Sequence, residues 1–505
     1  MTKSRSKNAI INMSMSFLNQ FTTLILSFVS RTIFIKVLGI ELLGINGLFS
    51  DVLSLLSMAD LGFNTAMVYS FYKPIADNDT KKISALINFY KKIYRTIAIS
   101  ITVIGVAFTP FIHLIVNTPE PIPLLKVYYL FALGGVIISY LFVYKTSIIT
   151  ADQKNYVVTR ITIVINFIKT IIQIVSLVIF KNYILYLAIN LIGNFLNNYI
   201  ASKKAVVLYP YIKQKEDLGY DDKKGIFENI KSIFLYKLSS LLLNATDNTI
   251  ISILVGTISV GLYSNYLLIT NKLSMIIQIV FGSLTASIGN VVVKESHNKR
   301  YEIFKATQSI SFIICGIVVS NFYLLVNDFI KVWLGEQYLL SNTVVIAITL
   351  NMYLSCILQP LWTYREATGL YVKTKYIMLV AAIVNLILSV MLGKVMGIAG
   401  VILASVFAKL TTYFWYEPTI LFKEYFAEKV NKYYISIGIN VILTTIIIVF
   451  LNNSFLKHNV FSWSQWFIKA FISGSITSIL FILLYFKSDG FRIIRRKVKN
   501  FIISK

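Results

Sequence analysis

Apolar stretches recur along the whole chain, and each is long enough to cross the hydrocarbon core of a bilayer, which takes about 20 residues. The chain is 56% hydrophobic and only 14% charged, more apolar than a soluble protein of 505 residues could bury. We therefore predict an all-α polytopic membrane protein with about 14 spans. The spans lie at roughly 9–36, 43–70, 93–117, 123–148, 156–180, 183–208, 228–255, 258–292, 303–327, 340–364, 372–393, 397–422, 433–451 and 463–486.

Lysine and arginine are distributed unevenly over the two sides of this layout. Most of them lie in the N-terminal segment and in every second loop. The opposite loops hold few: Lys36, Lys126, Lys181, Lys331, Lys394, Lys457 and Lys469. Because short cytoplasmic loops collect positive charge, we predict that both termini are cytoplasmic. The net charge of +26 then belongs mostly to the cytoplasmic face, so anionic membrane lipids are expected partners and nucleic acid is not.

The two halves of the sequence resemble each other. When Thr32 is aligned with Thr249, further identical pairs follow without a gap: Ile33/Ile250, Gly39/Gly256, Gly44/Gly261, Leu56/Leu273, Ser57/Ser274 and Met58/Met275. A later pair, Asn166 with Asn385, has almost the same offset. The offset corresponds to six spans, and an even number preserves orientation, so we predict two parallel six-helix repeats. Chance matches among Ile- and Leu-rich helices are the alternative.

The repeat and the loops together predict a domain layout. An N-lobe would cover 1–208 and a C-lobe 228–425, joined by a cytoplasmic linker at 209–227. Two further spans would follow at 426–487, and a basic amphipathic tail at 488–505. Phe491, Ile494, Val498 and Phe501 share one helical face of that tail. An interfacial helix is the expected structure, with a solvated basic tail as the alternative.

Charged residues inside spans mark candidate functional sites, because burial of a charge in a bilayer is costly. The cations are Arg31, Lys169, Lys237, Lys272 and Lys409, and the acids include Asp60 and Asp247. If the cations line a central cavity, they would attract an anionic cargo such as a phosphate or diphosphate. Arg31 could instead reach the outer headgroups, and Asp247 could form a structural ion pair with a lysine.

The sixth predicted span carries a stripe of asparagines, at Asn190, Asn194, Asn197 and Asn198. Their spacing places them close together on one side of a helix. Such amides could hydrogen-bond sugar hydroxyls or bind neighbouring helices. No cluster of Cys or His residues indicates a metal site, and we expect no cofactor.

The N-terminal residues resemble a known family. The segment "SRTIFIKVLGIELLGINGLFSDVLSLLSMADLGFNTAMVYSFYKPIADNDTKKISALINFYKKIYR" (30–95) is similar to the opening of Wzx-type lipid-linked oligosaccharide flippases, the polysaccharide-transporter branch of the MATE-like MOP exporter superfamily. The matching features are Arg31, the Leu38-Gly39 to Leu43-Gly44 turn, "ADLGF" at 59–63 and "YKPIADND" at 72–79. "ITADQKNY" at 149–156 fits as well.

The resemblance implies two six-helix lobes and two C-terminal helices. It also implies a non-enzyme in the bacterial cytoplasmic membrane that flips undecaprenyl-diphosphate-linked repeat units for capsule, exopolysaccharide or O-antigen synthesis. Arg31 is the cation that lies in the matched segment. From their depth in the spans, Lys169, Lys237, Lys272 and Lys409, with Asn190 and Asn194, are further candidates for cargo binding. Asp60 and Asp247 are candidates for coupling to an H⁺ or Na⁺ gradient, and a polysaccharide polymerase and a chain-length regulator are expected partners.

Three other functions fit parts of the sequence. A MATE-type antiporter of organic cations would share the lobes but carry a cargo of the opposite charge. A peptidoglycan-precursor flippase would share both the lobes and the charge of the cargo. A polytopic polymerase or glycosyltransferase is disfavoured by the internal repeat and by the short outer loops.

Overall fold

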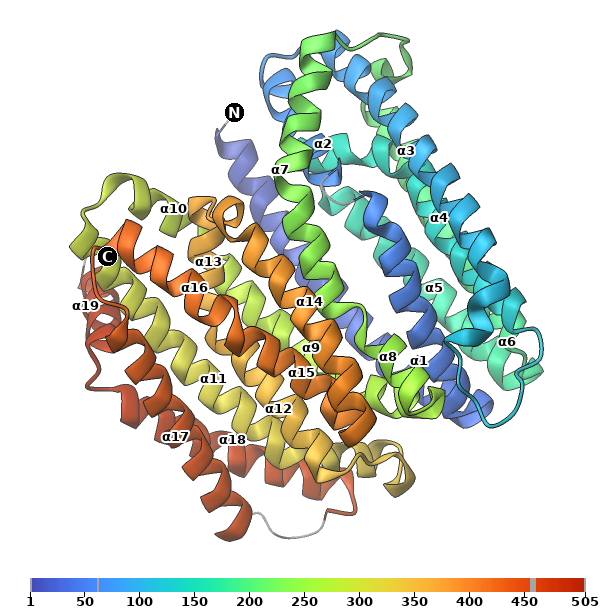
Figure 1. Ribbon diagram of the computed structural model, residues 1–505. Helices are drawn as coiled ribbons and strands as arrows, with labels where there is room; N and C mark the ends of the chain where they lie inside the picture. Colours follow the sequence, from blue (N-terminus) through green and yellow to red (C-terminus); the bar gives the residue numbers. More distant parts are fainter. Residues whose placement is uncertain (1, 61–62, 455–459, 504–505) are drawn as a thin grey trace. The chain divides into compact units, whose positions relative to one another are not determined.

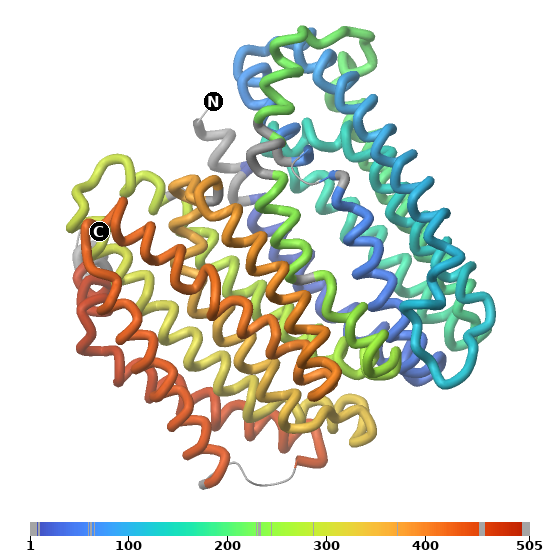
Figure 2. Tube along the Cα trace, in the orientation of Figure 1, coloured from blue at the N-terminus to red at the C-terminus, as the bar shows by residue number. Residues whose placement is uncertain are grey.

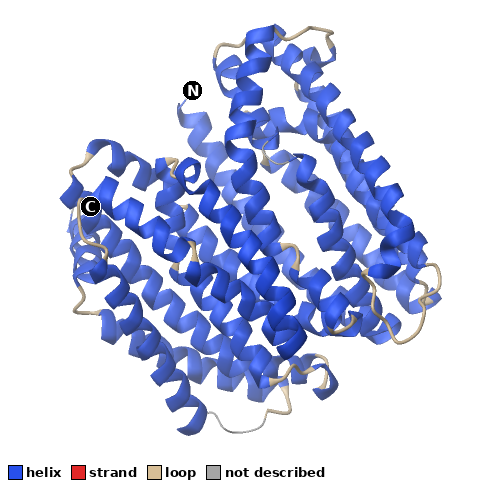
Figure 3. Cartoon of the chain, in the orientation of Figure 1, coloured by secondary structure: helices blue, strands red, loops and turns tan. Residues whose placement is uncertain are grey.

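The computed structural model describes residues 2–60, 63–454 and 460–503, and the course of the chain is traced in Figure 2. These residues form helices joined by short loops, and none of them lies in a strand (Figure 3). The chain divides into two compact units, Met1–Gly261 and Leu262–Lys505. The predicted all-α membrane fold is confirmed.

The first unit contains eight helices and three short helical turns within the described residues (Figure 1). They are α1 (Thr2–Leu56), η1 (Ser57–Asp60), α2 (Phe63–Ala76), α3 (Thr80–Phe108), η2 (Thr109–Leu114), α4 (Leu125–Ala151), α5 (Tyr156–Phe180), α6 (Tyr183–Leu208), η3 (Pro210–Lys213), α7 (Tyr220–Asn244) and α8 (Asp247–Leu254). α4 packs against α3 and α6, and α5 packs against α1 and α6.

The second unit begins inside α9 (Thr257–Gly282). It continues with α10 (Thr285–Lys294), α11 (His297–Trp333), η4 (Glu336–Tyr338), α12 (Asn342–Ile357), α13 (Gln359–Thr368), α14 (Tyr371–Met396), α15 (Ile398–Thr411), α16 (Tyr413–Leu421), η5 (Phe422–Phe426), α17 (Asn431–Ser454), α18 (Trp463–Tyr485) and α19 (Asp489–Ile503). α11 packs against α12, α17, α18 and α19.

Eleven described helices are long and apolar enough to cross a membrane, or up to twelve if α12 and α13, which meet at 40°, form one span. The stretch Ile11–Leu56 counts once among them, yet as a straight helix it would be about 69 Å long, far more than one hydrocarbon core. α7, whose first half is rich in charge, is not among the eleven. The predicted count of about 14 therefore stays a prediction.

α1 consists of two helices that meet at Gly39. This glycine has φ 87° and ψ 170°, which breaks the helical path inside α1. Its partner in the sequence repeat, Gly256, also has a positive φ, of 121°. Because positive φ is a conformation that glycine adopts without steric cost, both repeats place a glycine where the chain must turn.

The next pair of repeat glycines forms a close contact between α1 and the start of α9. A Cβ atom built on Gly44 would lie 2.1 Å from the carbonyl oxygen of Thr257, and one built on Gly261 would lie 2.3 Å from that of Ile40. Ile40 and Thr257 are themselves equivalent in the alignment of the repeats. The contact is therefore reciprocal, as expected for elements related by a two-fold axis.

Two of the motifs that carry the family resemblance have structural roles. In "YKPIADND", the Asp79 carboxylate accepts a hydrogen bond from the Lys82 amide at 2.9 Å and so caps α3. In "ITADQKNY", the loop before α5 is held by Asn12 of α1, whose side chain bonds the Gln153 carbonyl and the Tyr156 amide at 2.8 and 2.7 Å. Residues 61 and 62 of "ADLGF" lie outside the described residues.

The predicted linker at 209–227 lies against the first unit. The side chain of Asn88 in α3 donates to the Gln214 carbonyl at 2.8 Å, and Ser84 donates to the Tyr211 carbonyl at 2.8 Å. Tyr209 donates to the Asp152 carboxylate at 2.6 Å. Burial, together with this hydrogen bond, raises the pKa of Tyr209, so its hydroxyl stays protonated as a donor at neutral pH.

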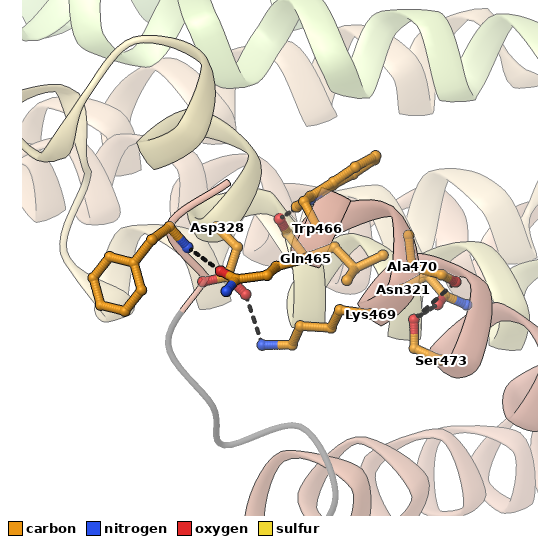
Figure 4. Close-up of polar contacts among 9 residues, drawn as sticks. Asn321, Asp328, Gln465, Trp466, Lys469, Ala470 and Ser473 are labelled. Carbon is orange, nitrogen blue, oxygen red and sulfur yellow. Dashed lines mark hydrogen bonds and ion pairs between the residues drawn. The ribbon is translucent and has the colours of Figure 1, made fainter. Parts of the chain in front are cut away.

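Polar side chains of α18 contact polar side chains of α11 (Figure 4). Lys469 forms an ion pair with Asp328 at 2.6 Å. Ser473 donates to the side-chain oxygen of Asn321 at 2.7 Å, and the Asn321 amide donates to Thr477 at 2.8 Å. Polar groups in a membrane protein are stable when they bond each other in this way. The tail helix α19 also packs on α11, while the side chains of Val498 and Phe501 lie outside the described residues.

Candidate functional site

A stripe of small polar side chains runs along α1 after its glycine break and ends at the first residue of η1. Its members recur every three or four residues and so share one face of the helix; they are Asn46, Ser50, Ser54 and Ser57. The Ser54 hydroxyl donates to the Ser50 carbonyl at 2.7 Å, and the Ser57 hydroxyl donates to the Leu53 carbonyl at 2.8 Å. The Ser54 proton is therefore used within the helix, and its hydroxyl oxygen keeps lone pairs that can accept from a ligand.

This stripe lines a cavity of about 660 Å³ inside the first unit. Side chains from α4, α6 and α7 complete the walls. The other polar residues of the lining are Asp60, Asn64, Ser139, Tyr140, Asn190, Asn194 and Lys237, and the aromatic rings are Phe49 and Phe131. Amides, hydroxyls and aromatic faces are groups that can contact a ligand carrying many hydroxyls.

Asp60 and Lys237 supply one charge of each sign to the cavity lining. Asp60 ends η1, and Lys237 lies in α7, far along the sequence. Lys237 and the Tyr94 hydroxyl are electrostatic neighbours of the Asp60 carboxylate. Folding thus brings together a predicted cargo-binding lysine and a predicted ion-coupling acid.

Lys169 is bonded to both predicted asparagines. Its ammonium donates to the side-chain oxygen of Asn190 at 3.1 Å and to that of Asn194 at 3.4 Å. The two amides line the cavity, whereas Lys169 is not among the described residues that do so. Of the remaining asparagines in the stripe, Asn197 accepts from Thr162 at 3.2 Å and Asn198 donates to the Asn194 carbonyl at 2.8 Å.

Arg31 and Asp247 also lie in the first unit, but neither belongs to the described cavity lining. Arg31 in α1 has Tyr186 of α6 as an electrostatic neighbour. Asp247 is the first residue of α8, where the next backbone amide, that of Asn248, donates to the Asp51 carboxylate at 3.3 Å.

The other two predicted cations lie in the second unit. Lys409 in α15 donates to Asn351 at 2.7 Å and to Ser355 at 2.9 Å, both in α12. The alignment that pairs Asn166 with Asn385 also pairs Lys409 with Asn190. Each repeat thus places a polar side chain at the same position of its sixth predicted span, which contains α6 in the first repeat and α15 in the second. Lys272, in α9, is half-buried.

The sequence interpretation missed an ion pair in the second unit. Arg365 donates to the Glu417 carboxylate at 2.7 Å, and their side chains are only 10% and 5% exposed. Arg365 directly follows the predicted span 340–364, so the predicted layout places it in a loop. The sequence feature that could have indicated this pair is Glu417, which lies inside the predicted span 397–422. A charge buried in a membrane protein is normally paired.

The cavity serines were missed as well, although their spacing in an apolar span is visible in the sequence. Across the described residues, no group of three or more His, Cys, Asp or Glu side chains could hold a metal ion. The lining offers hydrogen bonds and charge to a ligand.

No known family model matches the sequence, and no curated protein matches it either. Solved structures do match it. A structure of the lipid II flippase MurJ in an inward closed conformation has a TM-score of 0.66 and 16% identity, over 94% of this chain and 99% of that chain. An inward-facing multidrug resistance MATE transporter of the MOP superfamily has a TM-score of 0.61 and 13% identity, over 78% and 93% of the two chains.

A third match is a MOP superfamily transporter from Pyrococcus furiosus, described as having a binding pocket of reverse polarity. Its TM-score is 0.54 and its identity 14%, over 81% of this chain and 93% of that chain. These neighbours are transporters rather than enzymes. Identities this low establish a shared fold, and the apolar helices agree with it. The chain is a multi-pass membrane protein with a MATE/MurJ-like fold.

Proposed function

We propose that this protein is a flippase for undecaprenyl-diphosphate-linked oligosaccharide repeat units. The observation that carries the proposal is the cavity of the first unit, whose lining combines hydroxyls and amides with Lys237. Such walls can bond sugar hydroxyls, while the lysine attracts an anionic group. The sugar chain and its diphosphate would pass through the protein by alternating access while the polyprenyl tail stays in the lipid.

The charge of the site favours an anionic cargo over an organic cation. Asp60 is balanced by Lys237, which is its electrostatic neighbour. Lys169 adds a further positive charge, and its hydrogen bonds go to the neutral amides of Asn190 and Asn194. Because the Lys169 ammonium lies behind the amides of a low-dielectric wall, it attracts anions, and this cavity would disfavour the cationic drugs that a MATE-type antiporter exports.

The fold agrees with a lipid-linked cargo. The lipid II flippase structure matches over 94% of this chain, and the multidrug transporter structure matches over 78%. A peptidoglycan-precursor flippase is therefore the second candidate, and a MATE-type antiporter is the third. The resemblance of residues 30–95 to Wzx-type flippases is the reason for preferring an oligosaccharide unit.

The proposal includes a cellular setting. The chain would lie in the bacterial cytoplasmic membrane with both termini in the cytoplasm, where its basic loops would face anionic lipids. It would move cargo to the outer leaflet for capsule, exopolysaccharide or O-antigen synthesis. A polymerase and a chain-length regulator would act on the flipped unit. Asp60 and Asp247 would couple transport to an H⁺ or Na⁺ gradient, and Arg31, Lys272 and Lys409 would attract the cargo at other positions.

A reconstituted transport assay would test the proposal. Purified protein in liposomes would receive a fluorescent undecaprenyl-diphosphate oligosaccharide, and a membrane-impermeant quencher would report the fraction that changes leaflet. We expect rapid flipping by the wild-type chain and slow flipping by Lys237→Gln. The exposed residue Lys181 provides the matched control, Lys181→Gln. Flipping of lipid II alone would favour the second candidate, and export of ethidium without lipid flipping would refute the proposal.

A further inference from the structure

The side chain of Lys169 in α5 passes over helix α6 at Gly193. A Cβ atom built on Gly193 would lie 2.4 Å from Cδ of Lys169, 2.7 Å from Cγ and 3.2 Å from Cβ. The lysine stem therefore occupies the space that any larger side chain at Gly193 would need. This path brings the ammonium to Asn190 and Asn194, which flank the glycine on the same helix.

The two contacts orient the asparagine side chains. An ammonium is a donor without an acceptor, so it bonds amide oxygens and not amide nitrogens. Both amide oxygens therefore face Lys169, which leaves the NH₂ groups for other partners. The side-chain nitrogen of Asn194 lies 3.6 Å from the Cβ position of Gly135, and Gly135 in α4 lines the cavity.

We infer that Lys169 is a positioning residue, which holds the Asn190 and Asn194 amides so that their N–H groups donate to acceptor oxygens of an anionic cargo. Lys169 acts through the two amides, since they line the cavity and the lysine does not appear in its described lining. Without the ammonium, each amide would be free to rotate and present either its oxygen or its nitrogen. The identity of the cargo rests on the proposed function, whereas the geometry of the three residues does not.

A double-mutant cycle in the liposome assay tests this role. The variants are Lys169→Met, which keeps the stem and removes the donors, Asn190→Leu/Asn194→Leu, and the combination of all three. We expect a KM about tenfold higher in each case, with the combined variant no worse than the asparagine variant, because Lys169 acts only through the amides. Vmax should change less than twofold, since a fault in folding would lower Vmax rather than raise KM.

Two further variants sharpen the cycle. Lys169→Arg supplies donors at a similar reach, so its KM should return to within about threefold of wild type. Lys203→Met, on the exposed end of the same helix α6, should leave KM unchanged. If the KM of the combined variant is about a hundredfold higher than that of wild type, Lys169 and the amides act independently. That result would overturn the inference.

Changing the glycan of the cargo shows which acceptor oxygens the two amides bind. Lys169→Met is assayed with a neutral glycan and with one carrying a uronic acid, both on the diphosphate lipid. A defect with both means that the amides meet the diphosphate, and a defect with the acidic glycan alone means that they meet its carboxylate. If Lys169→Met raises KM with neither glycan, the positioning role of Lys169 is refuted. If the wild-type chain moves no such lipid, the proposed function fails, and the same cycle is run on lipid II. Non-additivity there would support the positioning role, and additivity would refute it.

Discussion

The reciprocal contact between Gly44 and Gly261 predicts a sharp difference between two glycines on one helix. In Gly44→Ala, the new methyl group would lie 2.1 Å from the Thr257 carbonyl oxygen, where ordinary contacts begin at 3.4 Å. Backbone cannot move aside as a side chain does, so α1 and the first turn of α9 must separate. Overpacking of this kind costs about 1–3 kcal/mol, and the better helix propensity of alanine offsets about 0.5–1 kcal/mol.

Gly47→Ala is the matched control. A Cβ atom there would meet Cγ1 of Val260 at 3.5 Å, an ordinary van der Waals contact. The same change on the same helix should therefore stabilise the protein by up to about 1 kcal/mol. The five tryptophans allow thermal unfolding of the purified protein in detergent to be followed by intrinsic fluorescence. We expect Gly44→Ala to lower the apparent Tm by about 2–6 °C relative to Gly47→Ala.

The reciprocity of the contact adds a second expectation. Gly261→Ala should destabilise as Gly44→Ala does, because its methyl group would lie 2.3 Å from the Ile40 carbonyl oxygen. The double variant should lose less than the sum of the two single losses, since either methyl group already separates the same helices. Equal Tm values for Gly44→Ala and Gly47→Ala would refute the close approach of the two helices.

Three further changes test contacts that fix the fold. Arg365→Met leaves the Glu417 carboxylate buried without its ion pair, and should cost about 3–5 kcal/mol in thermal unfolding, most of which Arg365→Met/Glu417→Leu should restore. Lys469→Met removes the partner of Asp328, which is 21% exposed, so we expect a smaller loss of about 1–3 kcal/mol and faster proteolysis before α18; unchanged proteolysis would contradict this. Tyr209→Phe removes a donor to a carboxylate and should cost about 1–2 kcal/mol, measured against Tyr220→Phe, whose ring is 80% exposed.

The sequence alone determined the class of the fold. Apolar segments of membrane-spanning length follow from local composition, so they can be read without a structure. The matching glycines of the two halves were also visible in the sequence. The structure explains why they are glycines: Gly39 and Gly256 have a positive φ, and Gly44 and Gly261 make close backbone contacts. The count of spans was less secure, because α1 bends inside an apolar segment.

For the candidate site, the sequence determined which side chains are unusual but not which of them meet. Asn190 and Asn194 were predicted from their spacing on one helix, which is a local property. Their bonds to Lys169, and the nearness of Asp60 to Lys237, depend on how separate helices pack. Periodicity within one helix carries no information about the rotation of its neighbour.

Tertiary structure alone decided the partners of the buried charges. Arg365 and Glu417 lie on different helices, and each looked like a residue near the end of a span until packing placed them 2.7 Å apart. The serines of α1 and η1 became the lining of a cavity because α4, α6 and α7 leave space opposite them. A charge or polar group that is removed from water is costly unless it has a partner. Its partner comes from another helix, so it can be identified only after the chain has folded.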